Sequence, residues 1–530
     1  MTGLTNLVGG RALLDYARRP LNTVLLVVVP IAIVFVWGGA LADFSKVILG
    51  GKGQRLQIEV ATAGWAAAAL AGLIGFFQVV GSQSADRRLA AAGGRTASVV
   101  AGRLSAAFGL ALVAAAAGLA ALVVRTGFSN PIRVVTATVA IAVIYLALGV
   151  LVGTTVRSEM NGALLITLVW VFDVFLGPAL GPGSSLLTRF FPLHFPSLVL
   201  IGQRSGHGGP IGDVGWSIAW ALGLAALATA RVVFATRPKS LPNHAGAVAV
   251  TAPTPLLPTS LPASSPPSPT RTRPLRGTPR WIAVLQAGMR EYRRNRVLWA
   301  LLVVVPAVFI GMAIMITVDM PGPIALVEGD RHFVALLSQR RMHAATMVPI
   351  TSAFLAGIAG LFVVTESARG DRRLVLAGLR TREVLAGRVG VITAATVLTT
   401  AVAIAVSGSW YAPRQWLVFA AANLLIALTY AMVGVLVGPI TGRIGGLYLI
   451  LMLAFIDVGL GQSVMMPDGP PTWGAFLPAR GASQMMIDGA FTVDFDRLRA
   501  LLLALAWLAA FITAATAVFH HRSRRVPQPS

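Results

Sequence analysis

Two aspartates stand inside long apolar runs, where a carboxyl group needs an explanation. Asp173 lies in LVWVFDVFLG and Asp457 in LMLAFIDVGLG, and Tyr145 and Tyr430 stand in the apolar runs that come before them. An ionised carboxylate in such a run is energetically costly and often marks a proton, cation or ligand site. A tyrosine hydroxyl can instead bond the carboxyl group and satisfy both partners. The sequence favours this packing role, Tyr145 with Asp173 and Tyr430 with Asp457, and leaves proton or ligand contact open.

A second chemical signal is an arginine-rich segment that occurs twice. DRRLAAAGGRTASVVAGR, starting at Asp86, returns as DRRLVLAGLRTREVLAGR, starting at Asp371, and 12 of the 18 positions match. The bias of cytoplasmic loops toward arginine explains the charge but not the order of residues. Because loops drift unless contacts hold them, the retained order predicts a surface that docks a partner. We expect that surface to consist of Asp86, Arg87, Arg88, Leu89, Gly93, Arg95, Thr96, Arg103, Asp371, Arg372, Arg373, Leu374, Gly378, Arg380, Thr381, Glu383 and Arg388.

The elements that carry these residues are predicted to be membrane-spanning helices. Of the 530 residues, 56% are hydrophobic and only 12% are charged, and the mean hydropathy is +0.77. Such a chain is too apolar for a soluble globule and reads as an all-α polytopic membrane protein. Runs of about 20 apolar residues, long enough to cross a bilayer, number twelve in our prediction. They lie near 21–41, 61–82, 104–124, 133–156, 161–181, 214–236, 298–318, 345–366, 389–409, 415–438, 444–464 and 498–519.

The twelve spans divide into two parallel six-helix repeats. Most matches between the halves keep an offset of about 285 residues, and LLVVVP recurs within the first span of each half at an offset of 276. We therefore predict a six-helix domain over 1–237 and a second over 280–530, with a proline-rich cytoplasmic linker over 238–279. An amphipathic interfacial helix is expected before each domain, at RALLDYARRP and WIAVLQAGMREYRRNR.

The charge pattern predicts the orientation in the membrane. Most of the 43 lysines and arginines fall in segments on the side of the termini, which places both termini in the cytoplasm of a multi-pass protein of the cell membrane. The net charge of +24 thus follows from topology, and no nucleic-acid partner is expected. The first apolar run has span length and no small-residue cleavage site, so no cleavable signal peptide is expected.

Small residues in the second span of each half are candidates for the seam around a central cavity, because they permit close helix approach. They are Gly72, Gly75, Phe76, Gly357, Gly360 and Leu361. Ordinary packing inside one half is the alternative. The segments after each fifth span are too long for tight turns and predict short interfacial helices. The chain has no cysteine, and His194 and His207 are scattered single residues, so no metal site is expected.

These features together resemble a known family. An amphipathic helix, six spans, a charged loop between spans two and three and a long external segment before span six resemble the membrane subunit of type-2 ABC exporters. The likeness is greatest to the double-length actinobacterial permeases for polyketide antibiotics such as tetronasin. It covers nearly the whole chain except the linker, and the combination of motifs carries it. It implies two copies of a separate ATPase, each meeting one arginine-rich loop and holding ATP and magnesium.

The resemblance implies a permease that exports a hydrophobic or amphipathic small molecule from the bilayer region. The chain has no phosphate-binding G-x-x-x-x-G-K-[ST] loop, the nearest match being GGKGQ at Gly50. We therefore expect a transport subunit that binds no cofactor and is not itself an enzyme. A proton-coupled transporter of the major facilitator type is the alternative, although its loop motif wants Gly-Arg soon after Asp-Arg. The sequence does not identify the compound.

Overall fold

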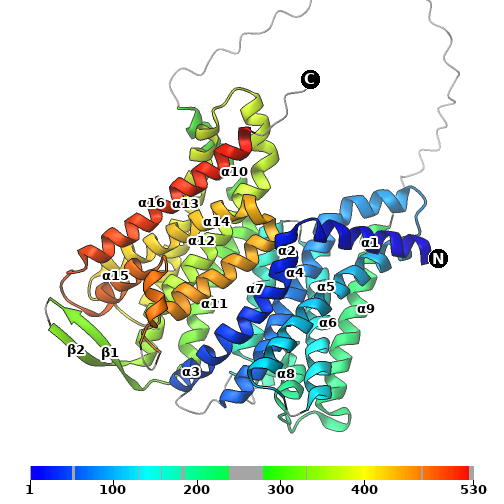
Figure 1. The fold of residues 1–530 in the computed structure, drawn as a ribbon, viewed down its shortest axis with the longest axis horizontal. Coiled ribbons are helices and arrows are strands. Elements are labelled where there is room, and N and C mark those ends of the chain that lie inside the picture. The colour runs from blue at the N-terminus through cyan, green and yellow to red at the C-terminus, as the bar shows by residue number, and fades with distance from the viewer. Residues whose placement is uncertain are drawn as a thin grey trace, which may run out of the picture.

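The structure is a computed structural model (Figure 1) that describes residues 2–49, 54–128, 130–156, 158–180, 186–237, 279–329, 331–466 and 469–524. The predicted linker, 238–279, lies outside the described residues except for its last position.

The N-terminal half is entirely helical where it is described. A π-helical turn over Ile33–Trp37 joins its second and third helices, and 3₁₀ turns cover Leu186–Phe190 and Gly209–Ile211. Its helices are α1 (Thr2–Ala17), α2 (Pro20–Ala32), α3 (Gly38–Ile48), α4 (Arg55–Ala91), α5 (Thr96–Arg125), α6 (Pro131–Thr155), α7 (Glu159–Phe175), α8 (His194–Ile201) and α9 (Gly212–Thr236).

The C-terminal half follows the same order and adds a pair of strands. A π-helical stretch, Phe455–Gly461, continues its longest helix, and a 3₁₀ turn covers Thr472–Phe476. Its elements are α10 (Arg280–Arg294), α11 (Arg296–Ile316), β1 (Pro321–Glu328), β2 (Arg331–Ser338), α12 (Gln339–Leu376), α13 (Thr381–Gly408), α14 (Trp416–Ala454), α15 (Arg480–Phe491) and α16 (Leu498–Arg524).

Ten segments of the described chain are helical, long and apolar enough to cross a membrane. The difference from the twelve expected runs has two local causes. Helix α7 covers one expected span but has only 17 residues. Two others fall in one continuous segment, Trp416–Gly461, which bends at Gly442, where φ is 73° and the conformation is not helical. Glycine permits that backbone because it has no Cβ. The chain is therefore a helical, multi-pass membrane protein.

Local sequence explains where several helices begin. Pro131 occupies the first turn of α6, where its missing N–H is not needed, and the Asn130 side chain accepts from the Arg133 amide at 3.1 Å. Ser338 caps α12 in the same manner, accepting from the Arg341 amide at 3.2 Å. Both are standard N-caps that satisfy amides left free at a helix start.

The all-helical expectation fails in one place, the segment before α12. Strands β1 and β2 pair antiparallel, with Glu328 opposite Arg331 at the turn. Along β1 the side chains alternate, and Ile324 and Leu326 are buried. Alternation of this kind places one face of a strand against the protein. Gly329, with φ of 59°, makes the tight connection.

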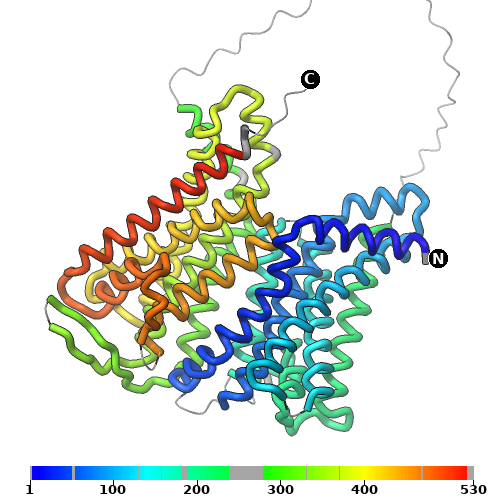
Figure 2. Tube along the Cα trace, viewed as in Figure 1, coloured from blue at the N-terminus to red at the C-terminus, as the bar shows by residue number. Residues whose placement is uncertain are grey.

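The two halves lie side by side, the first in blue to green and the second in green to red (Figure 2). Contacts between α7 and α11 and between α2 and α14 join them. Helices α9 and α16 are peripheral, with only 11% of their most apolar windows buried. Helices α1 and α10 lie at one end of the molecule, with the α4–α5 and α12–α13 turns; we call it the loop end. Helix α8 and the β1–β2 pair lie at the opposite end (Figure 1).

Candidate functional site

Each arginine-rich segment folds as the tip of a helical pair, α4–α5 or α12–α13. Gly93 and Gly378 end the first helix of each pair with φ of 91° and 93°. The amide after each glycine bonds back to the carbonyl five positions earlier, at 3.0 and 3.1 Å. This is the Schellman helix ending, which needs a left-handed residue and therefore favours glycine. The repeated glycine is thus explained by the turn and not by a partner.

The repeated aspartates also serve the fold of the tips. Asp86 and Asp371 are buried. Arg103 contacts Asp86 at 2.9 Å and Arg388 contacts Asp371 at 2.8 Å. In both copies the serine one turn before the aspartate, Ser82 in the first, donates to the same carboxylate, at 2.7 and 2.8 Å. These two aspartates and two arginines hold neighbouring helices together, so their retention between the copies has an explanation within the fold.

The remaining members of the predicted surface are divided between solvent and the fold. Thr96, Thr381 and Leu374 are half-buried, whereas Leu89 is 41% exposed. The Glu383 carboxylate accepts from the Arg380 amide at 2.9 Å and so caps the start of α13. The arginines that stay exposed are matched between the copies: Arg87, Arg88 and Arg95, and Arg372, Arg373 and Arg380. These six cations are what the tips offer to a partner.

The amphipathic helices pack against these tips through equivalent contacts. A Cβ added to Gly102 would lie 2.5 Å from the Thr5 carbonyl oxygen of α1. One added to Gly387 would lie 2.6 Å from Val284 Cβ and 3.0 Å from the Trp281 carbonyl oxygen of α10. Glycine therefore lets the helices touch in both halves. Because of this close contact, movement of a tip must also displace the amphipathic helix that packs against it, α1 or α10.

The structure brings the expected Asp–Tyr pairs together. Tyr145 Oη donates to Asp173 Oδ2, and Tyr430 Oη donates to Asp457 Oδ2 at 2.9 Å. The same carboxylates accept backbone amides at the start of the short outer helices, from Leu193 at 3.3 Å and from residue 479 at 2.9 Å. All four side chains are buried. The pairs tie α7 to α6 and the π-helical stretch Phe455–Gly461 to α14, and they tie both to the short helices α8 and α15, as a packing role requires.

The six small or apolar residues considered for the seam have the contacts of the alternative interpretation, packing within one half. A Cβ on Gly75 would lie 2.4 Å from the Leu146 carbonyl oxygen, and one on Gly360 would lie 2.1 Å from that of Ala431. Gly72 likewise faces α6 and α7, and Gly357 faces α14. Phe76 contacts Gly162, and Leu361 contacts Gly438. Small residues here let α4 approach α6, and α12 approach α14, within one half.

The observed seam has polar contacts that the sequence analysis missed. Asn161 Nδ2 donates to Asn295 Oδ1 at 2.9 Å. Glu159, at the start of α7, forms an ion pair with Arg443 of α14, whose guanidinium also reaches the Thr365 carbonyl oxygen at 3.5 Å. A signal was present: at the offset of 284 that relates the two aspartates, Glu159 aligns with Arg443. Opposite charges at equivalent positions of a two-fold repeat can pair across its axis.

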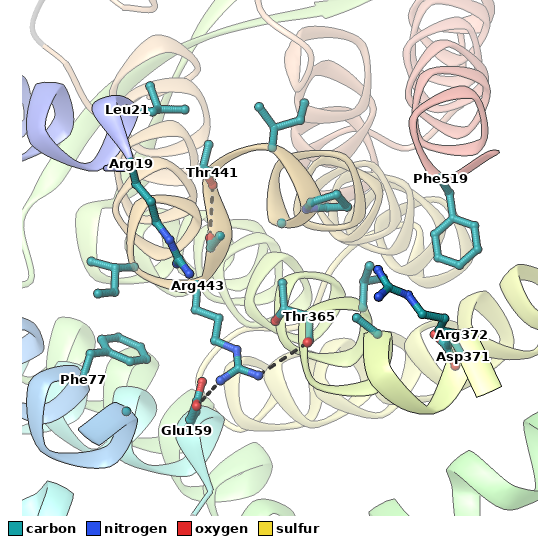
Figure 3. A pocket seen from close by; sticks show the side chains of 18 of the residues that line it. Arg19, Leu21, Phe77, Glu159, Thr365, Asp371, Arg372, Thr441, Arg443 and Phe519 are labelled. Carbon is teal, nitrogen blue, oxygen red and sulfur yellow. Dashed lines mark hydrogen bonds and ion pairs between the residues drawn. The ribbon is translucent and has the colours of Figure 1, made fainter. Parts of the chain in front are cut away.

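The Glu159–Arg443 pair lines two cavities at the loop end. We call the larger, about 930 Å³, the arginine cavity (Figure 3). Its charged lining is Arg18, Arg19, Arg372, Arg443, Glu159 and Asp371. We call the smaller, about 380 Å³, the balanced cavity, and its charged lining is Arg388, Arg443, Glu159 and Glu366.

Two histidines expected to be isolated meet near the outer cap of the first half. His194 Nε2 and His207 Nε2 are 3.1 Å apart. Burial, reinforced by His207, lowers the pKa of His194 to about 4, although Asp213 opposes the shift. A neutral pair can share one proton between its facing nitrogens. Within the described residues no three metal-ligating side chains gather.

A scan against family models and a search of curated proteins find no match to this chain.

Proposed function

We propose that the chain is the membrane subunit of an ATP-driven exporter of the type-2 ABC class, moving hydrophobic or amphipathic compounds. One observation carries this: at the loop end, both halves present a helix-pair tip with three exposed arginines and an amphipathic helix packed against it. Two such units at one end of a membrane protein suit two copies of one soluble partner. The loop resemblance supports an ATPase as that partner.

The exposed arginines are the docking groups in this proposal. Arg87, Arg88 and Arg95 would meet one ATPase, and their matched residues in the second half would meet the other. Arginine suits this because its planar group forms paired bonds with carboxylates. ATP and magnesium would be held by the partner subunit, since neither half of this sequence contains a phosphate-binding loop.

The proposal includes a layout of twelve spans in two parallel six-helix repeats. Helix α7 counts as a short fifth span, and α14 with its π-helical continuation counts as spans four and five on either side of Gly442. The chain then lies in the cell membrane, with both termini and both tips on its cytoplasmic side, as the arginine bias requires. The equal packing of α1 and α10 supports this reading.

The compound would travel along the seam between the halves. The arginine cavity lies there, beside the starts of both fifth spans, and its volume is in the range of small-molecule sites. Closing or opening the ATPase pair would move the tips and, through α1 and α10, the two halves relative to each other. Transport by alternating access follows from such a motion.

The test is transport in inside-out membrane vesicles that contain the full chain and its ATPase. We expect ATP to drive accumulation of a hydrophobic fluorescent compound, vanadate to block it, and a protonophore to leave it unchanged. Replacing Arg95 and Arg380 by Glu together should abolish it, whereas Arg414→Glu, an exposed site outside both tips, should not. Accumulation driven by a proton gradient without ATP would overturn the proposal and favour the facilitator class.

A further inference from the structure

The arginine cavity has an excess of positive charge that its own carboxylates do not neutralise. Four arginines line it against two acidic residues, Glu159 and Asp371. Asp371 is already paired with Arg388, and Glu159 is paired with Arg443. Among the described residues, no carboxylate forms an ion pair with the guanidinium of Arg19 or Arg372. Both side chains are exposed, so they can attract an anion by charge and by paired hydrogen bonds to its oxygens.

The two unpaired arginines approach the ion pair from different sides. A Cβ on Gly442 would lie 3.1 Å from Arg19 Nη1, so Arg19 extends over the residue next to Arg443. Arg372 reaches the cavity from α12 (Figure 3). Three guanidinium groups from three elements therefore surround one space. A single carboxylate or phosphate group is the ligand chemistry that such a set recognises.

The rest of the lining is apolar. Leu21, Phe77, Val364, Ile444 and Phe519 contribute to the wall, and Figure 3 places Phe77 and Phe519 on opposite sides of the cavity. A hydrocarbon chain next to such side chains leaves water, which is favourable at about 25 cal/mol per Å² of apolar surface. The lining thus fits a molecule with one anionic head and an apolar body.

The balanced cavity shows that this charge is particular to one side of the seam. The repeat offsets align three residues of the balanced cavity with three residues of the arginine cavity. Asn295 aligns with Arg19, Glu159 aligns with Arg443, and Glu366 aligns with Gly81. Its lining holds two arginines and two carboxylates. Duplication has therefore left one cavity cationic and its counterpart neutral.

We propose that the arginine cavity binds an amphiphilic anion, with Arg19, Arg372 and Arg443 receiving its carboxylate or phosphate head. The Glu159 carboxylate is then an internal competitor, since it already holds Arg443. Arg372 is also one of the six exposed tip arginines assigned to the ATPase, so anion binding is measured without ATPase, where Arg372 has only the cavity role. The further claim that such anions are the transported class rests on the proposed function.

The test is equilibrium binding of dansyl-labelled undecanoate to the full chain in phosphatidylcholine nanodiscs without ATPase, with empty discs subtracted. We expect saturable binding at least tenfold tighter than that of dansyl-labelled undecanol, which has the same body without charge. Equal affinities for the two probes would overturn the proposal, whatever the transport assays show.

Variants give effects of opposite sign. Glu159→Gln should tighten binding of the carboxylate about tenfold, because the competitor is removed while Arg443 stays. Arg372→Gln should weaken it about tenfold, whereas Arg87→Gln, the matched residue in the first half, lies outside the cavity and should not change it. Arg19→Asn, which copies the other half, should also weaken it. Weaker binding by Glu159→Gln, or equal effects at Arg372 and Arg87, would contradict the assignment.

A second arm separates a lipid headgroup from a soluble amphiphile. If anionic lipid occupies the site, discs containing phosphatidylglycerol should weaken probe binding, and Arg372→Gln should remove that dependence. If the site takes soluble amphiphiles, the lipid composition should leave the affinity unchanged. Either result supports an anion site, and absence of specific probe binding in both kinds of disc contradicts it.

Discussion

The two cavities at the loop end lie beside the same Glu159–Arg443 pair and have partly equivalent linings, but their chemistry differs. One is lined by four arginines and two acidic residues, the other by two of each. By contrast, the helix-pair tips beside them keep the same buried ion pair, the same serine and the same glycine turn. The duplicated framework has been retained and the space between the halves has diverged. We expect equal effects from framework substitutions and unequal effects where the environments differ.

The largest expected effect breaks the framework in either half. In α6 a Cβ on Gly149 would lie 1.9 Å from the Gly72 carbonyl oxygen, and in α14 one on Gly434 would lie 2.1 Å from that of Gly357. Alanine at either position forces the helices apart, and we expect a loss of about 3 kcal/mol of stability in each variant. Thermal melting in detergent, followed by size-exclusion chromatography, measures it.

The matched control for those two variants is Gly223→Ala, at a helical site with open space around it, which should leave the melting temperature nearly unchanged. If only one of the two buried glycines is sensitive, the halves do not share a framework.

A smaller effect is expected when the ion pair within each tip is removed. Arg103→Met and Arg388→Met each leave a buried aspartate without its cation, and each should destabilise the tip by about 2 kcal/mol. Hydrogen exchange of the amides on both sides of the turn measures this. Comparable increases in the two halves are predicted; a change confined to one half would show that the tips differ in more than their surface residues.

The Asp–Tyr pairs should respond unequally. Asp457 also accepts from Gln462 Nε2 at 3.2 Å and from a backbone amide at 2.9 Å, whereas Asp173 accepts from Tyr145 and from one amide at 3.3 Å. Tyr145→Phe should therefore destabilise by about 1.5 kcal/mol, and Tyr430→Phe by about half as much. Melting temperatures of the two variants, measured side by side, test the order. The reverse order would show that the additional hydrogen-bond donors to Asp457 do not compensate for the lost tyrosine hydroxyl.

The smallest effect is a pH dependence that His194 gives to the cap of the first half. Burial and the neighbouring His207 lower the pKa of His194 to about 4, below the value near 6.5 of an unfolded histidine. The unfolded state therefore binds the proton first as pH falls. Stability from this neutral histidine is present above about pH 6.5 and declines toward pH 4, by about 1 kcal/mol for a cap that can open locally.

Hydrogen exchange of α8 and α15 at pH 7 and pH 5 measures that dependence. In the second half Arg480 takes the place of His194, so α15 lacks this histidine, although burial raises the pKa of its own Asp488. His194→Gln should remove the response of α8, and a response that persists in this variant would assign it to another group.

Sequence patterns predicted the features that repeat. Apolar runs marked the helices, and duplicated aspartates and tyrosines marked pairs that the structure brings together. The order of residues in the tips was noticed for the right reason but misassigned in part: Asp86 and Gly93 are retained for an ion pair and a helix ending, which depend on contacts between helices. A pattern of constraint does not say whether the constraining contact is internal or external.

The seam could not be predicted from the same patterns. Gly72 and Gly357 permit close approach of some helix, but a small residue does not state which one. The Glu159–Arg443 pair joins residues whose charges differ between the halves, so a search for identical positions passes over it. The strands β1 and β2 lie in the segment where the offset between the halves changes from 276 to 285 residues. In each case the deciding contact lies far away along the chain.

The measurement that tests the account most directly is the number of ATPase subunits bound by one chain, obtained by native mass spectrometry of the purified complex. We predict two for the unaltered chain. Replacing Arg87, Arg88 and Arg95 by Glu should leave one, the same change at Arg372, Arg373 and Arg380 should also leave one, and both together should leave none. Transport by a chain with no ATPase bound would contradict the account. So would an unchanged number of bound ATPase subunits after both sets of arginines are replaced.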